Sequence, residues 1–182
     1  MSRSIGGYLV LAWVLACAQE PPPSEGSLEV SWAGKDSGSI SGSANARWCA
    51  LRRVLEVQTI QGDTGIALAL YPGQSVVPGN YPVLESTRAE SLPPAAAVAL
   101  RWLGPSVVQG FRGDSGRVVL ERTGEGRFSG RLSSRARSVV DTQRITLTGS
   151  FRDLVVRPDS LGCTAPEEDV SQDADPADTG VH

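Results

Sequence analysis

Histidine, lysine and aromatic residues are scarce in this sequence, which excludes several kinds of active site. The one histidine, His182, is the last of the 182 residues, the one lysine is Lys35, and aromatic residues make up 5% of the chain. A catalytic serine or cysteine needs a base beside it, most often histidine, to take its proton. A phosphate-binding Gly-x-x-x-x-Gly-Lys loop needs a lysine that this sequence does not place in such a motif. We therefore predict no catalytic residue of these types.

Cysteine is scarce as well, which limits metal sites. The three cysteines are Cys17, Cys49 and Cys163, and with one terminal histidine they do not make up the ligands of a closed zinc site. The acidic stretch near the C-terminus lacks the glycine-centred spacing of an EF-hand calcium loop. The sequence thus predicts no metal site, no cofactor and no enzymatic activity. A carboxylate-based hydrolase is the one enzyme hypothesis left open.

Charge is unevenly distributed along the chain. Residues 28–165 carry 16 Lys and Arg against 12 Asp and Glu, whereas residues 166–182 carry six acids and no base. This balance falls well short of the basic footprint of a nucleic-acid-binding protein. We expect a mildly basic folded body over residues 28–165, followed by a disordered acidic tail over residues 166–182.

The N-terminus has the layout of an export signal. Arg3 precedes a twelve-residue apolar run from Ile5 to Ala16, which is too short to span a bilayer comfortably. The next feature, Val14-Leu15-Ala16-Cys17, resembles the lipobox of bacterial lipoproteins. The resemblance implies that residues 1–16 are a signal peptide and that Cys17 becomes a lipid-modified N-terminus in the cell envelope. No acid follows Cys17 directly, which in such lipoproteins favours the outer membrane.

A second interpretation of this segment stays open. Ordinary secretory cleavage after Ala16-Cys17-Ala18 also fits the small-x-small rule, and it would remove Cys17. The residues that follow, from Gln19 to Gly26, are rich in proline and polar side chains. Such a composition is typical of a tether that holds a folded domain away from a membrane. We therefore expect a lipid anchor and tether over residues 17–27.

Both interpretations leave the same pair of cysteines in the body of the protein. Cys49 and Cys163 lie 114 positions apart and bracket most of residues 28–165. An even number of cysteines in an exported chain indicates a disulfide bond. Two unrelated buried thiols are the alternative.

Apolar residues alternate with polar or small ones in many short stretches of the body. Leu28, Val30 and Trp32 alternate with Glu and Ser, and the same period recurs from Ile66 to Leu70 and from Ile145 to Phe151. Turn signals rich in Gly, Asp, Asn and Pro separate these stretches. The pattern predicts an all-β domain, a single antiparallel β-sandwich or partly closed barrel of about eight or nine short strands, with disordered termini.

Residues 93–104 fit two structures. Proline at the start and Gly104 at the end are typical of a helix. Val98, Leu100 and Trp102, however, alternate with Ala99 and Arg101, which indicates a strand. We predict a strand here and keep a short helix as the alternative.

Two short motifs are similar to protease loops. Gly113-Asp-Ser-Gly116 matches the core of the nucleophile loop of chymotrypsin-like serine proteases, which needs a histidine base. Asp63-Thr-Gly65 and Asp114-Ser-Gly116 are similar to the two aspartate loops of pepsin-like proteases, which come from two large lobes. A spacing of 51 residues is too short for such lobes. We predict tight turns at both places, with Asp capping the backbone.

One five-residue pattern occurs three times, as apolar, hydroxyl, glycine, polar, apolar. Its copies are Ile40–Ala44, Phe128–Leu132 and Leu147–Phe151. In a strand the first, third and fifth positions share one face. We predict that each glycine faces the interior and leaves room for a bulky neighbour, with an aromatic ring over at least one of them. The three tryptophans Trp32, Trp48 and Trp102 are the expected rings.

Arginines are concentrated in the last third of the body. Arg127, Arg131, Arg135 and Arg137 lie at near-alternate positions, so one strand face could carry them all. Such a ridge is a candidate surface for an anionic envelope component. The alternative is a solvated strand face that resists edge-to-edge pairing.

Three hypotheses for the function follow from these features. The first is a lipid-anchored, non-enzymatic module of the cell envelope with a structural or binding role. The second is a small calycin-like barrel that holds an apolar ligand or lipid in its interior, and the third is the carboxylate-based hydrolase. An open apolar cavity inside the barrel would distinguish the second hypothesis from the first.

Overall fold

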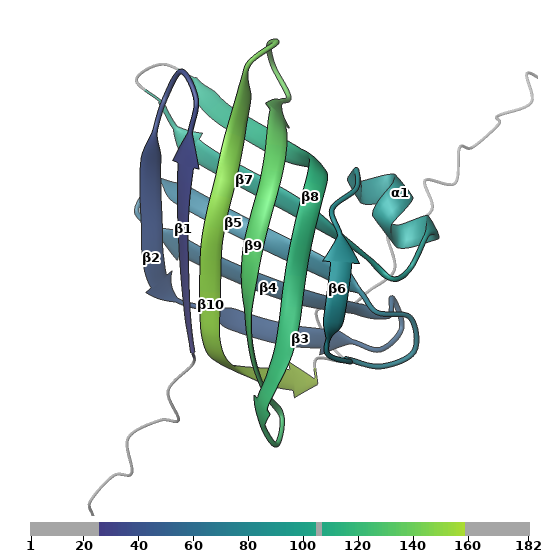
Figure 1. Cartoon of the computed structure of the whole chain (residues 1–182). Helices are drawn as coiled ribbons and strands as arrows, with labels where there is room; N and C mark the ends of the chain where they lie inside the picture. Colours follow the sequence, from purple (N-terminus) through teal and green to yellow (C-terminus); the bar gives the residue numbers. More distant parts are fainter. Residues whose placement is uncertain (1–25, 105–106, 159–182) are drawn as a thin grey trace, which may run out of the picture.

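The computed structural model describes residues 26–104 and 107–158, which form an all-β domain (Figure 1). The prediction of a sandwich or barrel is confirmed: seven strands close into a barrel and three more extend it. The strands are β1 (Ser27–Ala33), β2 (Gly38–Ser43), β3 (Asn45–Cys49), β4 (Val54–Gln61), β5 (Thr64–Tyr71), β6 (Gly79–Pro82), β7 (Ala95–Leu103), β8 (Val108–Gly124), β9 (Arg127–Ser138) and β10 (Arg144–Pro158), and the helix is α1 (Ser86–Ser91).

The barrel is built from two walls. The front wall consists of β2, β1, β10, β9, β8 and β6, and the back wall consists of β3, β4, β5 and β7. The strands of the back wall cross behind those of the front wall at a steep angle (Figure 1). Neighbouring strands pair antiparallel, except that β10 and β3 pair parallel. The arrangement combines features of a sandwich and a barrel.

Two long strands join the walls. β8 has 17 residues, and its first part pairs with β7 while its later part pairs with β6 and β9. β10 has 15 residues; it pairs with β9 and β1 over most of its length and reaches β3 through Val156–Pro158. These strands are longer than the alternation in the sequence predicts, because glycines and bulges let them bend from one wall into the other.

The interior of the barrel is filled by apolar side chains from both walls. Trp32 of β1 stacks on Trp102 of β7 with ring centroids 5.4 Å apart, and Trp102 stacks on Phe111 of β8 at 5.0 Å. Because β1 belongs to the front wall and β7 to the back wall, this stack connects the two. Aliphatic residues, such as Leu28, Leu68 and others on alternate positions of each strand, fill the rest.

The repeated five-residue pattern has the predicted orientation. The apolar ends of all three copies are buried, and the hydroxyl or polar residues between them point outward or are partly exposed. An aromatic ring lies over one glycine, as predicted: a methyl group added to Gly130 would overlap the ring of Phe151. The ring comes from another copy of the pattern and not from Trp32, Trp48 or Trp102, because β9 and β10 pair with Gly130 opposite Phe151.

Other local predictions have mixed outcomes. Residues 95–103 form the strand β7, so the strand prediction for 93–104 is confirmed, and Gly62 and Asp63 form the turn between β4 and β5. The turn prediction for Gly113–Gly116 is wrong. These residues lie inside β8 at a bulge, where Gly113 packs against Val83 and Gly116 has a φ of 119°. Their glycines therefore serve close packing and bending of a strand.

Several predictions concern residues outside the described ranges. They are the signal peptide, Cys17 and the tether up to residue 25, Cys163 and the acidic tail; Ser27, predicted as the last residue of the tether, is the first residue of β1. These stay predictions.

Candidate binding surfaces

The four arginines singled out in the sequence lie on the outer side of β9. Arg131, Arg135 and Arg137 are exposed and Arg127 is half-buried, while Phe128, Leu132 and other residues between them are buried. The alternation of a strand produces this separation, since neighbouring side chains point to opposite faces. β9 thus presents a line of positive charge to solvent from the centre of the front wall.

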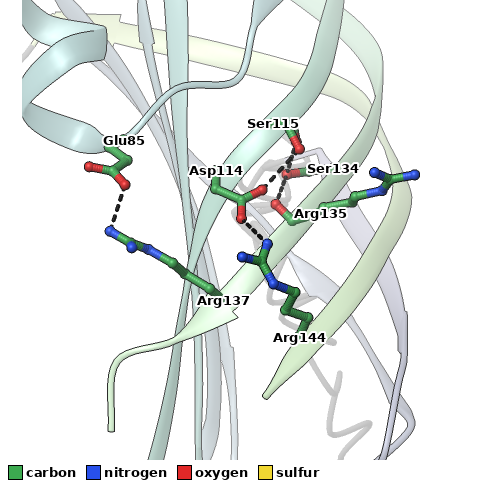
Figure 2. A network of polar contacts seen from close by, with 7 residues as sticks. All are labelled: Glu85, Asp114, Ser115, Ser134, Arg135, Arg137 and Arg144. Atoms are coloured by element: carbon green, nitrogen blue, oxygen red, sulfur yellow. Dashed lines mark hydrogen bonds and ion pairs between the residues drawn. The ribbon is translucent and has the colours of Figure 1, made fainter. Parts of the chain in front are cut away.

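Three of these four side chains have partners. Arg137 forms an ion pair of 2.5 Å with Glu85, and Arg131 forms a longer one of 3.4 Å with Glu121. Arg127 donates to the backbone carbonyl of Asp153 at 3.5 Å. The guanidinium of Arg135 has no ion pair or hydrogen-bond partner in the described part of the chain, and it points away from the neighbouring polar network (Figure 2). Exposed ion pairs of this type are weak and exchange readily with an incoming anion.

The strands on either side add arginines that the sequence analysis missed. The register places Arg112 of β8 and Arg144 of β10 on either side of Arg137, and Arg117 of β8 beside Ser133. The signal was present for one of them: Ile145 begins an alternating apolar stretch, so Arg144 before it had to point to the opposite face. We call the set Arg117, Arg131, Arg135, Arg137 and Arg144 the arginine face.

A shallow depression lies in the middle of the arginine face. It has a volume of about 460 Å³, and its lining includes Arg117, Arg131, Ser133, Thr148 and Asn80. Two guanidinium groups, two hydroxyls and an amide therefore surround one hollow that spans four strands. This combination can donate hydrogen bonds to anionic groups and exchange hydrogen bonds with hydroxyl groups.

The protease-like Asp-Ser pair of β8 is tied into structural contacts. Asp114 forms an ion pair of 2.8 Å with Arg144, and the hydroxyl of Ser115 donates to Asp114 at 2.9 Å (Figure 2). Ser134 is buried, and its hydroxyl lies 2.9 Å from the carbonyl oxygens of both Ser115 and Arg135. These contacts hold the bulge of β8 against β9.

Cys49 is fully buried at the end of β3. Its predicted partner, Cys163, lies outside the described residues, so the disulfide bond between them stays a prediction. In the described register the chain leaves β10 at Pro158, which pairs with Trp48, the residue before Cys49.

Burial shifts the titration of two tyrosines. Burial raises the pKa of Tyr81, whose hydroxyl donates to the carbonyl of Val77 at 2.5 Å. Burial likewise raises the pKa of Tyr71, and the negative charge of Glu90 adds to that rise. Both phenols are therefore neutral, structural groups at physiological pH.

The rest of the described chain adds few functional signals. Across residues 26–104 and 107–158, no three His, Cys, Asp or Glu side chains gather closely enough to hold a metal ion. None of the helical residues in those ranges belongs to a segment long and apolar enough to cross a bilayer. Comparison of the chain with protein-family models, with curated proteins and with solved structures found no match.

Proposed function

We propose that this protein is an exported, lipid-anchored module of the cell envelope, without enzymatic activity, and that its arginine face binds an anionic polysaccharide. The observation that carries the proposal is the pair of exposed arginines, Arg117 and Arg135, which have no ion-pair partner among the described residues. Unpaired guanidinium groups on neighbouring strands attract and hydrogen-bond carboxylate, sulfate or phosphate groups.

The surroundings of these arginines favour a sugar polymer as the anion. Hydroxyl side chains occupy the outward positions next to them, among them Ser133 and Thr148 in the depression and Thr146 and Ser150 farther along β10. Hydroxyls both donate and accept hydrogen bonds, which suits the hydroxyls of a sugar ring. Because the face extends over several strands, successive units of a polymer can bind to it at once.

Binding to a soluble polyuronate tests the proposal, with a neutral glucan as the reference polymer. We expect the double variant Arg117→Gln/Arg135→Gln to bind the polyuronate at least about tenfold more weakly, because each charge-assisted hydrogen bond contributes about 1.5–3 kcal/mol. The control Arg53→Gln/Arg88→Gln removes the same charge from exposed positions elsewhere. Equal losses in both variants would mean that only net charge matters and would refute a specific face.

The anchor is a separate part of the proposal. It is supported by the lipobox-like residues 14–17 and by the proline-rich segment after them. Two or three acyl chains on Cys17 are enough for stable membrane attachment. We expect Cys17→Ser to abolish incorporation of a labelled fatty acid and to release the protein from the membrane fraction. Unchanged labelling and partition would rule out the anchor.

We also propose that Cys163 is the partner of Cys49. The described chain ends beside Trp48, and Cys163 is five positions beyond Pro158. Five residues reach up to about 17 Å, which spans the distance to a neighbouring position. Peptide mapping without reduction should yield one species that joins the two cysteine-containing peptides. A Cys17–Cys49 species instead would disprove both this pairing and lipid attachment at Cys17.

The calycin-like alternative receives less support from the same structure. The Trp32–Trp102–Phe111 stack and the surrounding aliphatic residues occupy the space between the walls. An interior ligand would have to displace them. We therefore prefer binding on the outside of the barrel.

A further inference from the structure

The outer side of the back wall carries unusually small side chains. Ala67 pairs with Ala99, Ala69 pairs with Ala97, and Gly65 pairs with Arg101 across β5 and β7. Alanine and glycine cannot cover a sheet surface as longer side chains do. At one end the helix α1 covers this floor, where Ala89 packs against Ala95 and Ala97. At the other end the floor stays open.

The open part of the floor forms a groove. It has a volume of about 450 Å³, with Ala67 and Ala99 in its floor and Ile60, Val108 and Val139 among its lining residues. A second hollow of about 230 Å³ shares Gln58, Ala67 and Ala99 with the first and continues to Tyr71 and Ser86 near α1. We call the two together the alanine groove. The volume of the larger hollow is in the range of small-molecule sites.

The rim of the groove is apolar and exposed to solvent. Ile60 is 65% exposed, and Val108 and Val139 are each 53% exposed. Val139 is held there by a hydrogen bond of 2.9 Å from its N–H to the carbonyl of Gly110. Several large aliphatic side chains grouped around one hollow are uncommon on a solvated surface and indicate a binding site.

Two positive charges lie at the same groove. Arg101 and Arg112 line the larger hollow, and the residues that line it include no acid. The guanidinium of Arg101 lies over the floor, since a methyl group added to Gly65 would be 3.7 Å from its Nε. Neither arginine forms an ion pair within residues 26–104 and 107–158, although Asp63 lies in the adjoining hollow beyond Arg101. The charge of the site thus suits a ligand with one anionic end.

The backbone of the groove helps to identify the rest of the ligand. β4, β5, β7 and the start of β8 pair continuously along the floor, so their amide and carbonyl groups are used within the sheet. A bound peptide would find few partners for its own amides, and an unpaired buried amide is costly. An alkyl chain has no such groups. We infer that the alanine groove binds a long-chain fatty acid, with the chain along Ala67 and Ala99 and the carboxylate at Arg101 and Arg112.

Titration of the purified full-length protein with tetradecanoate tests where the alkyl chain of the ligand binds. The tetradecanoate is kept below the concentration at which it forms micelles. Ala67→Phe/Ala99→Phe should fill the groove from exposed positions and leave the core unchanged. Each methylene excluded costs about a factor of four in affinity, so we expect a loss of about a hundredfold or more. The matched control Ala33→Phe, at an exposed alanine of β1 on the front wall, should bind like the unmodified protein. Unchanged binding in the groove variant would overturn the inference.

Comparison with 1-tetradecanol tests the position of the head group. The unmodified protein should prefer the carboxylate by about tenfold or more, and Arg101→Gln/Arg112→Gln should abolish that preference while alcohol binding stays the same. A preference that survives in the arginine variant would refute the assigned head-group site.

If the protein binds neither ligand and Ala67→Phe/Ala99→Phe instead converts a dimer to a monomer in sedimentation, the groove is a self-association surface and the inference is wrong. Arg117→Gln/Arg135→Gln should not change fatty-acid binding, which keeps this inference separate from the polysaccharide proposal.

Discussion

The front and back walls of the barrel are alike on the inside and different on the outside. Both place aliphatic and aromatic residues inward at alternate positions. Outward, the front wall carries Arg, Ser and Thr on β8, β9 and β10, whereas the back wall carries Ala and Gly on β5 and β7. The inward residues therefore determine the fold, and the outward residues give each wall its own chemistry.

The difference in side-chain length explains why one wall has a charged surface and the other a groove. Arginine stems cover the backbone of the front wall while their charged ends remain in water. Alanines such as Ala67 and Ala99 leave the back wall uncovered where α1 does not reach. The same period-two pattern thus produces a depression lined by charged and polar groups on one side and a groove with an apolar floor on the other.

The largest effect should come from the stack that connects the walls. Phe111→Ala removes a ring that is 2% exposed and stacked on Trp102, and we expect a loss of about 3–5 kcal/mol in the free energy of unfolding. Urea unfolding followed by tryptophan fluorescence and by circular dichroism measures it. Val139→Ala, at a side chain that is 53% exposed, should change stability little.

Urea unfolding of Phe111→Ala also tests whether the two walls unfold independently of each other. If they share one core, both signals should fall in a single transition at the same urea concentration. Two separate transitions would show that each wall is stable alone. The front and back walls would then not be two surfaces of one common core.

An intermediate effect is expected within the front wall alone. A methyl group added by Gly130→Ala would overlap the carbonyl of Val119 and lie 2.7 Å from Cε2 of Phe151. We expect a loss of about 1–3 kcal/mol from overpacking and weaker polyuronate binding, because β9 carries three arginines of the face. Gly124→Ala is the control, since its added methyl would have contacts no closer than 3.7 Å. Equal stability of the two variants would contradict the assigned packing.

The smallest effect should be local and depend on pH. Asp141 lies in the β9–β10 loop, two positions after Val139, and hydrogen bonds from Gln143 and Ser138 lower its pKa below the ordinary value of 3.8. Because its pKa is lowered, the ionised carboxylate stabilises the loop at every pH above the ordinary pKa. This stabilisation is lost as the pH falls through the lowered pKa. The protection factor of the Gln143 amide, which corrects for the intrinsic pH dependence of exchange, should therefore fall in acid, and Asp141→Asn should remove that change. A decrease of equal size in the variant would assign the effect to another group.

The sequence predicted the fold well because alternation of large apolar residues with polar ones survives in almost every strand. The prediction from sequence failed where the inward and outward side chains do not differ in polarity. In Ile66–Leu70 the outward residues are alanines, so the exposed floor of the groove could not be told apart from the core. The helix α1 has six residues and no side-chain cap, and too little signal distinguishes such a helix from a loop.

The candidate surfaces were predictable only in part. Alternate arginines on β9 could be placed on one face from spacing alone. The row formed by Arg112, Arg137 and Arg144 depends on the register of three strands, and a register is fixed by long-range packing. The association of Ile60, Val108 and Val139 around one hollow depends on the same long-range order.

The pairing of β1 with β10 has a consequence for how the protein is made. The first and last strands lie side by side, and β10 also closes the barrel against β3. A topology with such distant contacts folds slowly, and here it cannot be completed until residue 158 is available. During synthesis from the N-terminus, β1 and β3 therefore each keep one unpaired edge until β10 has been made. Such edges are where a partly made chain can pair with another chain.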